Sequence, residues 1–289
     1  MKTIKNILIY LIATSSIIST CQRQTVTLFS HGIADTWKQI YQYLPSYTKK
    51  DIVFHNAHHT INKPFVSFNY PDATSRFYRV NYHETSFGQA NEIGRLYSAY
   101  KQTIKKFGND CDIILYGLSR GAANVIIFAG SYQLDHVKAL VLESPYYTMS
   151  EVIYSIMKKK NLEWLPLSYG ESIAETIFKR YTRYGTTPAG SLENIPKEMP
   201  ILIICSQEDH LVPAESSINV YKKLIESGHE HTYIFITNQG RHAAILSGPD
   251  GEKYEQVVNA FYKKYNLPYS AENAALGEPL LAQCQPTFE

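Results

Sequence analysis

The chain of 289 residues has few cysteines and lacks the cysteine spacing of metal-binding and redox sites. None of the four cysteines forms a C-x-x-C pair, so neither a zinc site nor a thioredoxin-type motif is indicated. Cys111 and Cys205 lie at the edges of apolar, strand-like runs, which predicts buried thiols and no disulfide framework. Four histidines, in a region that we interpret as a loop, are predicted to be solvated and not metal ligands: His55, His58, His59 and His83. We therefore expect no metal site.

An excess of charge of one sign is also missing. The net charge is +2, and the longest basic run is the triplet 158–160, so the sequence gives no electrostatic reason to expect nucleic-acid binding. We interpret that triplet as the last turn of a helix, where cations suit the helix dipole. Repeats and low-complexity tracts are missing too, which leaves an ordinary globular composition with 44% hydrophobic residues.

No apolar run at the N-terminus is long enough for a comfortable membrane span. Residues 7–18 form an apolar stretch of 12 residues after a basic start at Lys2 and Lys5, and small residues follow. This pattern predicts a signal peptide over residues 1–20 and an exported protein, secreted or periplasmic. Two alternatives stay open: lipidation at Cys21, and an uncleaved N-terminal anchor that would associate the protein with a membrane.

Apolar runs and helical patterns alternate along the rest of the chain. Strands are expected at 25–29, 51–55, 76–82, 112–116, 137–142, 201–205 and 232–237. Helices are expected at 93–104, 122–129, from 150 onward, and at 171–184, 215–228 and 252–266. Strands separated by helices predict an α/β fold with a mostly parallel central sheet flanked by helices. We assign this domain to residues 21–267 and interpret 268–289 as a loosely held tail.

A strand, a sharp turn and a helix surround Ser119. Residues 117–121 read G-x-S-x-G, the apolar run 112–116 precedes them and a helical pattern follows. Such a turn strains the backbone at the serine and needs small residues beside it, which Gly117 and Gly121 provide. The serine hydroxyl is then presented at a helix N-terminus. The motif in this context predicts a nucleophile.

An acid and a base follow Ser119 in the order expected on a parallel sheet. Asp209 comes after the strand-like run 201–205, and His242 comes after the run 232–237. His242 would take the proton of Ser119, and Asp209 would orient the imidazole. Competing carboxylates are Glu208 and Glu143, and we interpret Glu143 as a structural hydrogen-bonding group.

The tetrahedral intermediate of acyl transfer needs two hydrogen-bond donors. The backbone N–H of Arg120 follows the nucleophile directly. The second donor is expected in the loop after the first strand, at the N–H of Ile33 that follows His31 and Gly32.

Four motifs resemble those of the α/β-hydrolase superfamily: residues 30–33, 117–121, 209–213 and 240–242. Residues 142–147, with a short helical insertion after them, resemble the lipase, esterase and serine-aminopeptidase-like branch. The resemblance implies hydrolysis of esters, thioesters or amides through an acyl-enzyme, without a cofactor. It also implies a small helical cap, which we place at 146–195.

Function and substrate follow from the resemblance as expectations. We expect a serine hydrolase that cleaves carboxylic esters or thioesters of a small-molecule or lipid acyl substrate, with a serine aminopeptidase-like amidase or a non-catalytic binding protein as alternatives. Four large side chains of the cap either line an acyl pocket or pack the cap on the sheet: Tyr146, Tyr147, Trp164 and Leu165. Arg120 departs from the family pattern, because that position is more often small or apolar, and its side chain points either into the site or toward a carboxylate.

Overall fold

The computed structural model describes residues 23–33, 35–42, 52–55, 58–61, 65–73, 81–89 and 91–288. The predicted signal peptide, Cys21 and most of the strand expected at 76–82 lie outside these ranges. No helix in the described ranges is both long enough and apolar enough to cross a membrane.

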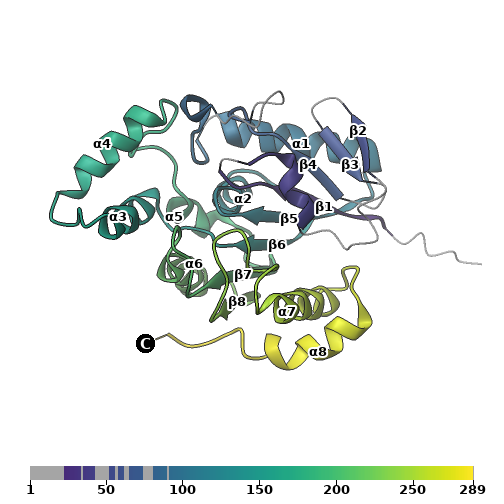
Figure 1. The fold of residues 1–289 in the computed structure, drawn as a ribbon. Helices are drawn as coiled ribbons and strands as arrows, with labels where there is room; N and C mark the ends of the chain where they lie inside the picture. The colour runs from purple at the N-terminus through teal and green to yellow at the C-terminus, as the bar shows by residue number, and fades with distance from the viewer. Residues whose placement is uncertain are drawn as a thin grey trace, which may run out of the picture.

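A single eight-stranded sheet forms the centre of the molecule (Figure 1). The strands lie in the order β2-β3-β4-β1-β5-β6-β7-β8, and the six strands from β4 to β8 in this order are parallel. The strands are β1 (Thr25–Ser30), β2 (Ile52–His55), β3 (His58–Ile61), β4 (Phe65–Phe68), β5 (Asp112–Leu118), β6 (Val137–Glu143), β7 (Ile201–Ser206) and β8 (Thr232–Thr237). The predicted α/β class with a mostly parallel sheet is therefore confirmed.

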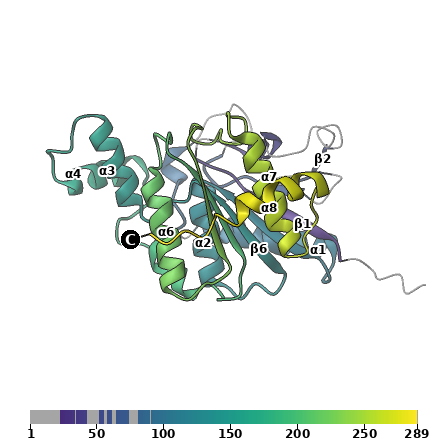
Figure 2. The same ribbon diagram turned by 90° about the horizontal axis from the view of Figure 1, so that it is seen from below.

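Helices cover both faces of the sheet (Figures 1 and 2). The long helices are α1 (Asn91–Phe107), α2 (Arg120–Ser131), α3 (Met149–Lys159), α4 (Leu167–Ile177), α6 (Ala214–Glu226), α7 (Gly251–Lys264) and α8 (Ala271–Leu281). Short helical turns are η1 (Trp37–Gln42), η3 (Tyr82–Glu84), α5 (Pro188–Ser191) and η4 (Leu192–Asn194). One apolar core joins α1, α2 and α6 to one face of the sheet, and a second joins α7 and α8 to the other.

The central strand β5 shows why these strands are apolar throughout. Ile113 and Leu115 enter the core under α1 and α2, whereas Ile114 and Tyr116 enter the core under α7. Because both faces of a parallel strand are covered, apolar residues occupy both sets of alternating positions. The same property made these strands recognisable in the sequence.

The sheet edge beside β4 differs from the prediction. Between residues 56 and 87 the one expected strand was 76–82, but β3 and β4 lie in this range, with β3 antiparallel to both β2 and β4. Each of these strands has four residues, and Pro64 and Pro71 flank β4. Runs this short carry too little periodicity to separate a strand from a loop.

The C-terminal segment also differs from the prediction of a loosely held tail. Residues 271–281 form α8, which begins at the N-cap Ser270 and packs against α7. The backbone N–H of Ile234 in β8 donates a hydrogen bond to the carbonyl oxygen of Cys284 at 2.7 Å. The sequence of α8 contains Gly277 and Pro279 and shows little amphipathic periodicity. Its small residues let the helix lie close to α7, but they do not form a stripe of large apolar side chains. The pattern therefore gave no helical signal.

Candidate active site

Ser119 lies in a strained turn between β5 and α2. Its φ is +55°, a left-handed conformation that is uncommon for a residue with a side chain. Its N–H donates to the carbonyl oxygen of Glu143 at 2.7 Å, which ties the turn to the neighbouring strand β6. A Cβ on Gly121 would lie 1.9 Å from the carbonyl oxygen of Ser30, and a Cβ on Gly117 would lie 2.5 Å from Ala122. Both glycines are therefore required by close backbone approach, as the sequence predicted.

Three side chains from three strand ends form one hydrogen-bonded chain. The Oγ atom of Ser119 lies 2.8 Å from Nε2 of His242, and Nδ1 of His242 lies 2.7 Å from Oδ2 of Asp209. The other carboxylate oxygen of Asp209 accepts the N–H groups of Leu211 and Val212, both at 2.9 Å. Asp209 is thus fixed by its own turn, and the structure brings the predicted nucleophile, base and acid together.

The competing residues lie elsewhere. Glu208 accepts the N–H of Gly240 at 3.1 Å, and His210 is exposed to solvent. Glu143 is fully buried and accepts the hydroxyl of Tyr254 at 2.7 Å. It is a structural hydrogen-bonding group, as the sequence predicted.

The loop after β1 is held at several points beside Ser119. The N–H of Gly32 donates to Oε1 of Gln39 at 2.7 Å. The carbonyl oxygen of Gly32 accepts two hydrogen bonds, from Nδ1 of His31 at 2.8 Å and from Nη2 of Arg120 at 3.1 Å. These contacts orient the peptide that leads into Ile33. Arg120 is the first residue of α2, so its backbone N–H has no acceptor within the helix.

The Arg120 side chain lies below the site and does not point toward substrate. Its residue exposure is 1%, and Nη1 is paired with Asp72 and, at 3.2 Å, with Oε1 of Glu92. The guanidinium carbon lies 4.6 Å from the centre of the Tyr70 ring. Burial disfavours the charge, but the carboxylates of Glu92 and Asp72 outweigh burial and raise the guanidinium pKa further. Of the two orientations that the sequence left open, the structure has the one toward carboxylates.

His31 is buried as a neutral imidazole beside this cluster. Its Nδ1–H donates to Gly32, and its Nε2 accepts the N–H of Tyr70 at 3.2 Å. Burial is the main cause that lowers the pKa of His31 to about 3, and the positive charge of Arg120 adds to it. Both ring nitrogens are satisfied only when one of them carries a proton, which agrees with the lowered pKa.

Sequence reasoning missed the residues that support Arg120. Asp72 lies in an irregular segment and Glu92 at the start of α1, and neither belongs to a recognisable motif. The signal that points to them is the arginine itself. A permanent cation followed by the apolar run of α2 needs buried carboxylates as partners, but sequence alone does not say which ones.

The cap packs against three parts of the site. The apolar cluster under α3 and α4 includes Phe87, Ala123 of α2 and Val212 of the Asp209 turn, and Ile33 packs against it. Tyr146 is buried in this cluster and Leu165 packs against its edge. Trp164 does neither of the two things considered for it, because 75% of its surface is exposed.

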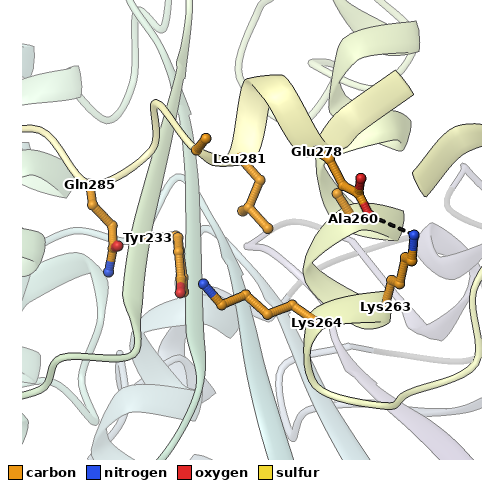
Figure 3. A pocket seen from close by; sticks show the side chains of 8 residues that line it. Tyr233, Ala260, Lys263, Lys264, Glu278, Leu281 and Gln285 are labelled. Atoms are coloured by element: carbon orange, nitrogen blue, oxygen red, sulfur yellow. Dashed lines mark hydrogen bonds and ion pairs between the residues drawn. The ribbon is translucent and has the colours of Figure 1, made fainter. Parts of the chain in front are cut away.

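A cavity lies at a different place in the fold (Figure 3). Its volume is about 390 Å³, and Tyr233 of β8, Ala260 of α7 and Leu281 of α8 contribute to its wall. Lys263 and Glu278 at its rim form an ion pair of 2.6 Å. The cavity is under α8, whereas His242 follows the carboxyl end of β8, so it is separate from the three hydrogen-bonded side chains. In the ranges that the structure describes, no group of three or more histidines, cysteines, aspartates or glutamates is placed to hold a metal ion.

Comparison with known proteins identifies a family. The sequence profile of the prolyl oligopeptidase family matches residues 96–267, which contain Ser119, Asp209 and His242. An uncharacterised Bacillus subtilis protein, YqkD, is 25% identical over 186 residues, 63% of this chain and 57% of its own length. An uncharacterised protein of Acanthamoeba polyphaga mimivirus is 28% identical over 135 residues, 45% of this chain and 42% of its own. The chain spans about half the length of these relatives.

Solved structures show the same fold. An esterase of Pyrococcus furiosus superimposes with a TM-score of 0.60 at 16% identity, covering 84% of this chain and 83% of the esterase. The acylaminoacyl peptidase of Pyrococcus horikoshii superimposes with a TM-score of 0.58 at 15% identity, covering 88% of this chain and 39% of the peptidase. The chain is thus an α/β hydrolase in fold and belongs to the prolyl oligopeptidase family.

Proposed function

We propose that this protein is a serine hydrolase that cleaves carboxylic ester or thioester bonds through an acyl-enzyme. The observation that carries the proposal is the hydrogen-bonded chain from Ser119 through His242 to Asp209, at 2.8 Å and 2.7 Å. An alcohol is a weak nucleophile at neutral pH, and a histidine within hydrogen-bond reach is the group that activates it.

The proposed reaction has two halves, formation of the acyl-enzyme and its hydrolysis, and Ser119, His242 and Asp209 act in both. His242 Nε2 takes the proton of Ser119 Oγ as Oγ attacks the acyl carbon, and Asp209 stabilises the imidazolium that forms. The N–H groups of Arg120 and Ile33 are the proposed donors to the oxyanion. His242 then gives the proton to the leaving group. Water, activated by His242, attacks the acyl-enzyme and regenerates Ser119.

A fluorophosphonate probe tests the nucleophile directly. We expect the wild-type protein to be labelled and Ser119→Ala to be unlabelled, with ester turnover reduced by about 10⁶-fold. Ser144→Ala is the matched control, because Ser144 is also buried, has a positive φ of 47° and follows the adjacent strand β6. Equal labelling of wild type and Ser119→Ala would rule out the proposal. A folded wild type that is not labelled would favour the non-catalytic binding protein.

A second candidate is a serine aminopeptidase-like amidase, which the family match favours. The same nucleophile, base and acid cleave amides, so the site geometry does not separate the two. Purified protein can be assayed with p-nitrophenyl esters of graded acyl length and with amino-acid p-nitroanilides. Faster turnover of the anilides would favour the amidase, and a preference among the esters would give the acyl length.

A further inference from the structure

One flank of α4 is apolar and uncovered. Leu167, Gly170 and Ala174 face inward, and a Cβ on Gly170 would lie 2.5 Å from the sulfur of Met157 in α3. Tyr169, Ile173 and Ile177 follow one another at intervals of four residues, so they share one face of the helix. They are 61%, 60% and 45% exposed. An amphipathic helix in a globular protein normally buries such a stripe.

The loop before α4 also exposes apolar side chains. Leu162 is 39% exposed, and Trp164 is 75% exposed. We call these two residues, together with Tyr169, Ile173 and Ile177, the cap patch. Both ribbon views place α4 at the periphery of the molecule, beyond α3 (Figures 1 and 2). Five large exposed apolar side chains in a loop and the helix that follows it are typical of an interaction surface.

Cations border the cap patch at both of its ends. Lys158, Lys159 and Lys160 precede the loop, Lys179 follows α4, and all four are exposed. They form no ion pair with any carboxylate in the described part of the chain. In this loop Glu163 is the one acidic residue.

The two acids of α4 share one arginine, so together with Glu163 they offset only two of the four lysine charges. Arg183 binds Glu171 at 3.2 Å and Glu175 at 2.7 Å. The apolar stripe is therefore flanked by free positive charge.

We propose that the cap patch docks on an anionic lipid surface. Tryptophan and tyrosine favour the interface between headgroups and acyl chains, and isoleucine and leucine side chains enter the acyl boundary. Lysines beside such a face pair with anionic headgroups. A second copy of this chain fits the patch less well, because the patch has cations at both ends, so either a parallel or an antiparallel pairing of two α4 helices would bring lysines toward lysines.

The inner side of the cap connects this surface to the site. The apolar cluster beneath α3 and α4 contains Ala123 and Val212, which belong to the helix after Ser119 and to the Asp209 turn. Docking through the cap patch would place the covered side of the site next to the lipid. The proposal concerns binding and does not depend on whether Ser119 is catalytic.

Trp164 is a built-in reporter, because the chain has only one other tryptophan. In full-length Trp37→Phe, Trp164 is the single tryptophan. We expect its emission to shift to shorter wavelength, and brominated acyl chains to quench it, on phosphatidylcholine vesicles that contain phosphatidylserine. A control reporter is Leu276→Trp in a Trp37→Phe, Trp164→Phe background, since Leu276 in α8 is 56% exposed and lies outside the cap. It should show neither effect, even if residues 1–20 also bind lipid.

Two further variants separate the apolar and electrostatic contributions. Ile173→Ser in the Trp37→Phe background should reduce the quenching of Trp164. Replacing Lys158, Lys159 and Lys160 by glutamine should weaken binding to phosphatidylserine vesicles by about 10²-fold, since each lysine near an anionic surface contributes about 1 kcal/mol. Unchanged Trp164 emission with these vesicles would overturn the proposal. A concentration-dependent dimer that Ile173→Ser dissociates, without lipid binding, would assign the patch to a second copy.

Discussion

Arg120 illustrates how a buried side chain next to Ser119 holds a neighbouring loop. Its Nη1 is neutralised by two buried carboxylates, while its Nη2 holds the carbonyl oxygen of Gly32. The guanidinium fork lets one cation bind both sides at once, and a lysine ammonium has no such fork. Arg120 is therefore a positioning residue for the loop that carries the Ile33 N–H.

Replacement of Arg120 should impair turnover more than substrate binding. Arg120→Lys keeps a positive charge near Asp72 and Glu92 but removes the Nη2 hydrogen bond to the carbonyl oxygen of Gly32, one of the contacts that orient this loop. We expect kcat for an ester substrate to fall by about 10²-fold with little change in KM, because loss of an oxyanion donor costs about 10²–10³ in rate. Steady-state kinetics measure kcat and KM separately.

A cap arginine provides the matched control for this experiment. Arg183→Lys alters an arginine that also binds two carboxylates, Glu171 and Glu175, but lies in the cap. It should leave kcat nearly unchanged. An Arg120→Lys variant with wild-type kcat would show that the loop is held without the guanidinium.

At the scale of elements, the C-terminal helix α8 is the helix that the sequence pattern did not predict. A Cβ on Gly277 would lie 1.9 Å from the carbonyl oxygen of Gln256 in α7, so glycine sets the distance between α7 and α8. Leu281 and Cys284 are buried next to the sheet as a result. Close approach of helix backbones requires small residues, and small residues weaken the periodic signal of a helix.

This packing predicts opposite effects of one substitution at two glycines. Gly277→Ala should lower the free energy of unfolding by about 1–3 kcal/mol, because it overpacks a backbone contact. Gly94→Ala should raise the free energy of unfolding by up to about 1 kcal/mol, because Gly94 is exposed in α1 and nothing lies within 4 Å of its added Cβ. Thermal or denaturant unfolding measures both. An equal response of the two variants would contradict a tight α7–α8 contact.

At the scale of the whole molecule, a buried neutral histidine links stability to pH. The pKa of His31 is lowered to about 3 in the folded protein from its ordinary value of 6.5. Between these values the unfolded chain binds a proton that the native protein does not bind. The free energy of unfolding should therefore fall as the pH drops from about 6.5 toward 3, with a slope from this group of up to about 1.4 kcal/mol per pH unit.

Unfolding in urea at a series of pH values tests this linkage. His31→Asn should flatten the pH dependence in that window, because asparagine has no proton to take up. His83→Asn should leave it unchanged, since His83 is exposed in η3. A wild-type profile that is flat between pH 3 and 6.5 would show that His31 is protonated in the folded protein.

The sequence by itself determined the parts of this protein that depend on local pattern. Apolar runs without alternation marked the parallel strands, and Gly117 and Gly121 marked the turn at Ser119. Ser119, Asp209 and His242 each follow a different parallel strand. Because the carboxyl ends of parallel strands lie at one edge of a sheet, the sequence predicted that these residues lie close together.

Only the tertiary structure decided the rest, since those features depend on contacts between residues far apart in the chain. The carboxylates that pair with Arg120 belong to Glu92 and Asp72, which lie 28 and 48 residues before it in the chain. The helix α8 is stabilised by α7 and β8 and not by its own pattern. Trp164 looked like a candidate for a buried pocket, but its side chain is exposed, because other residues fill the apolar cluster under α3 and α4.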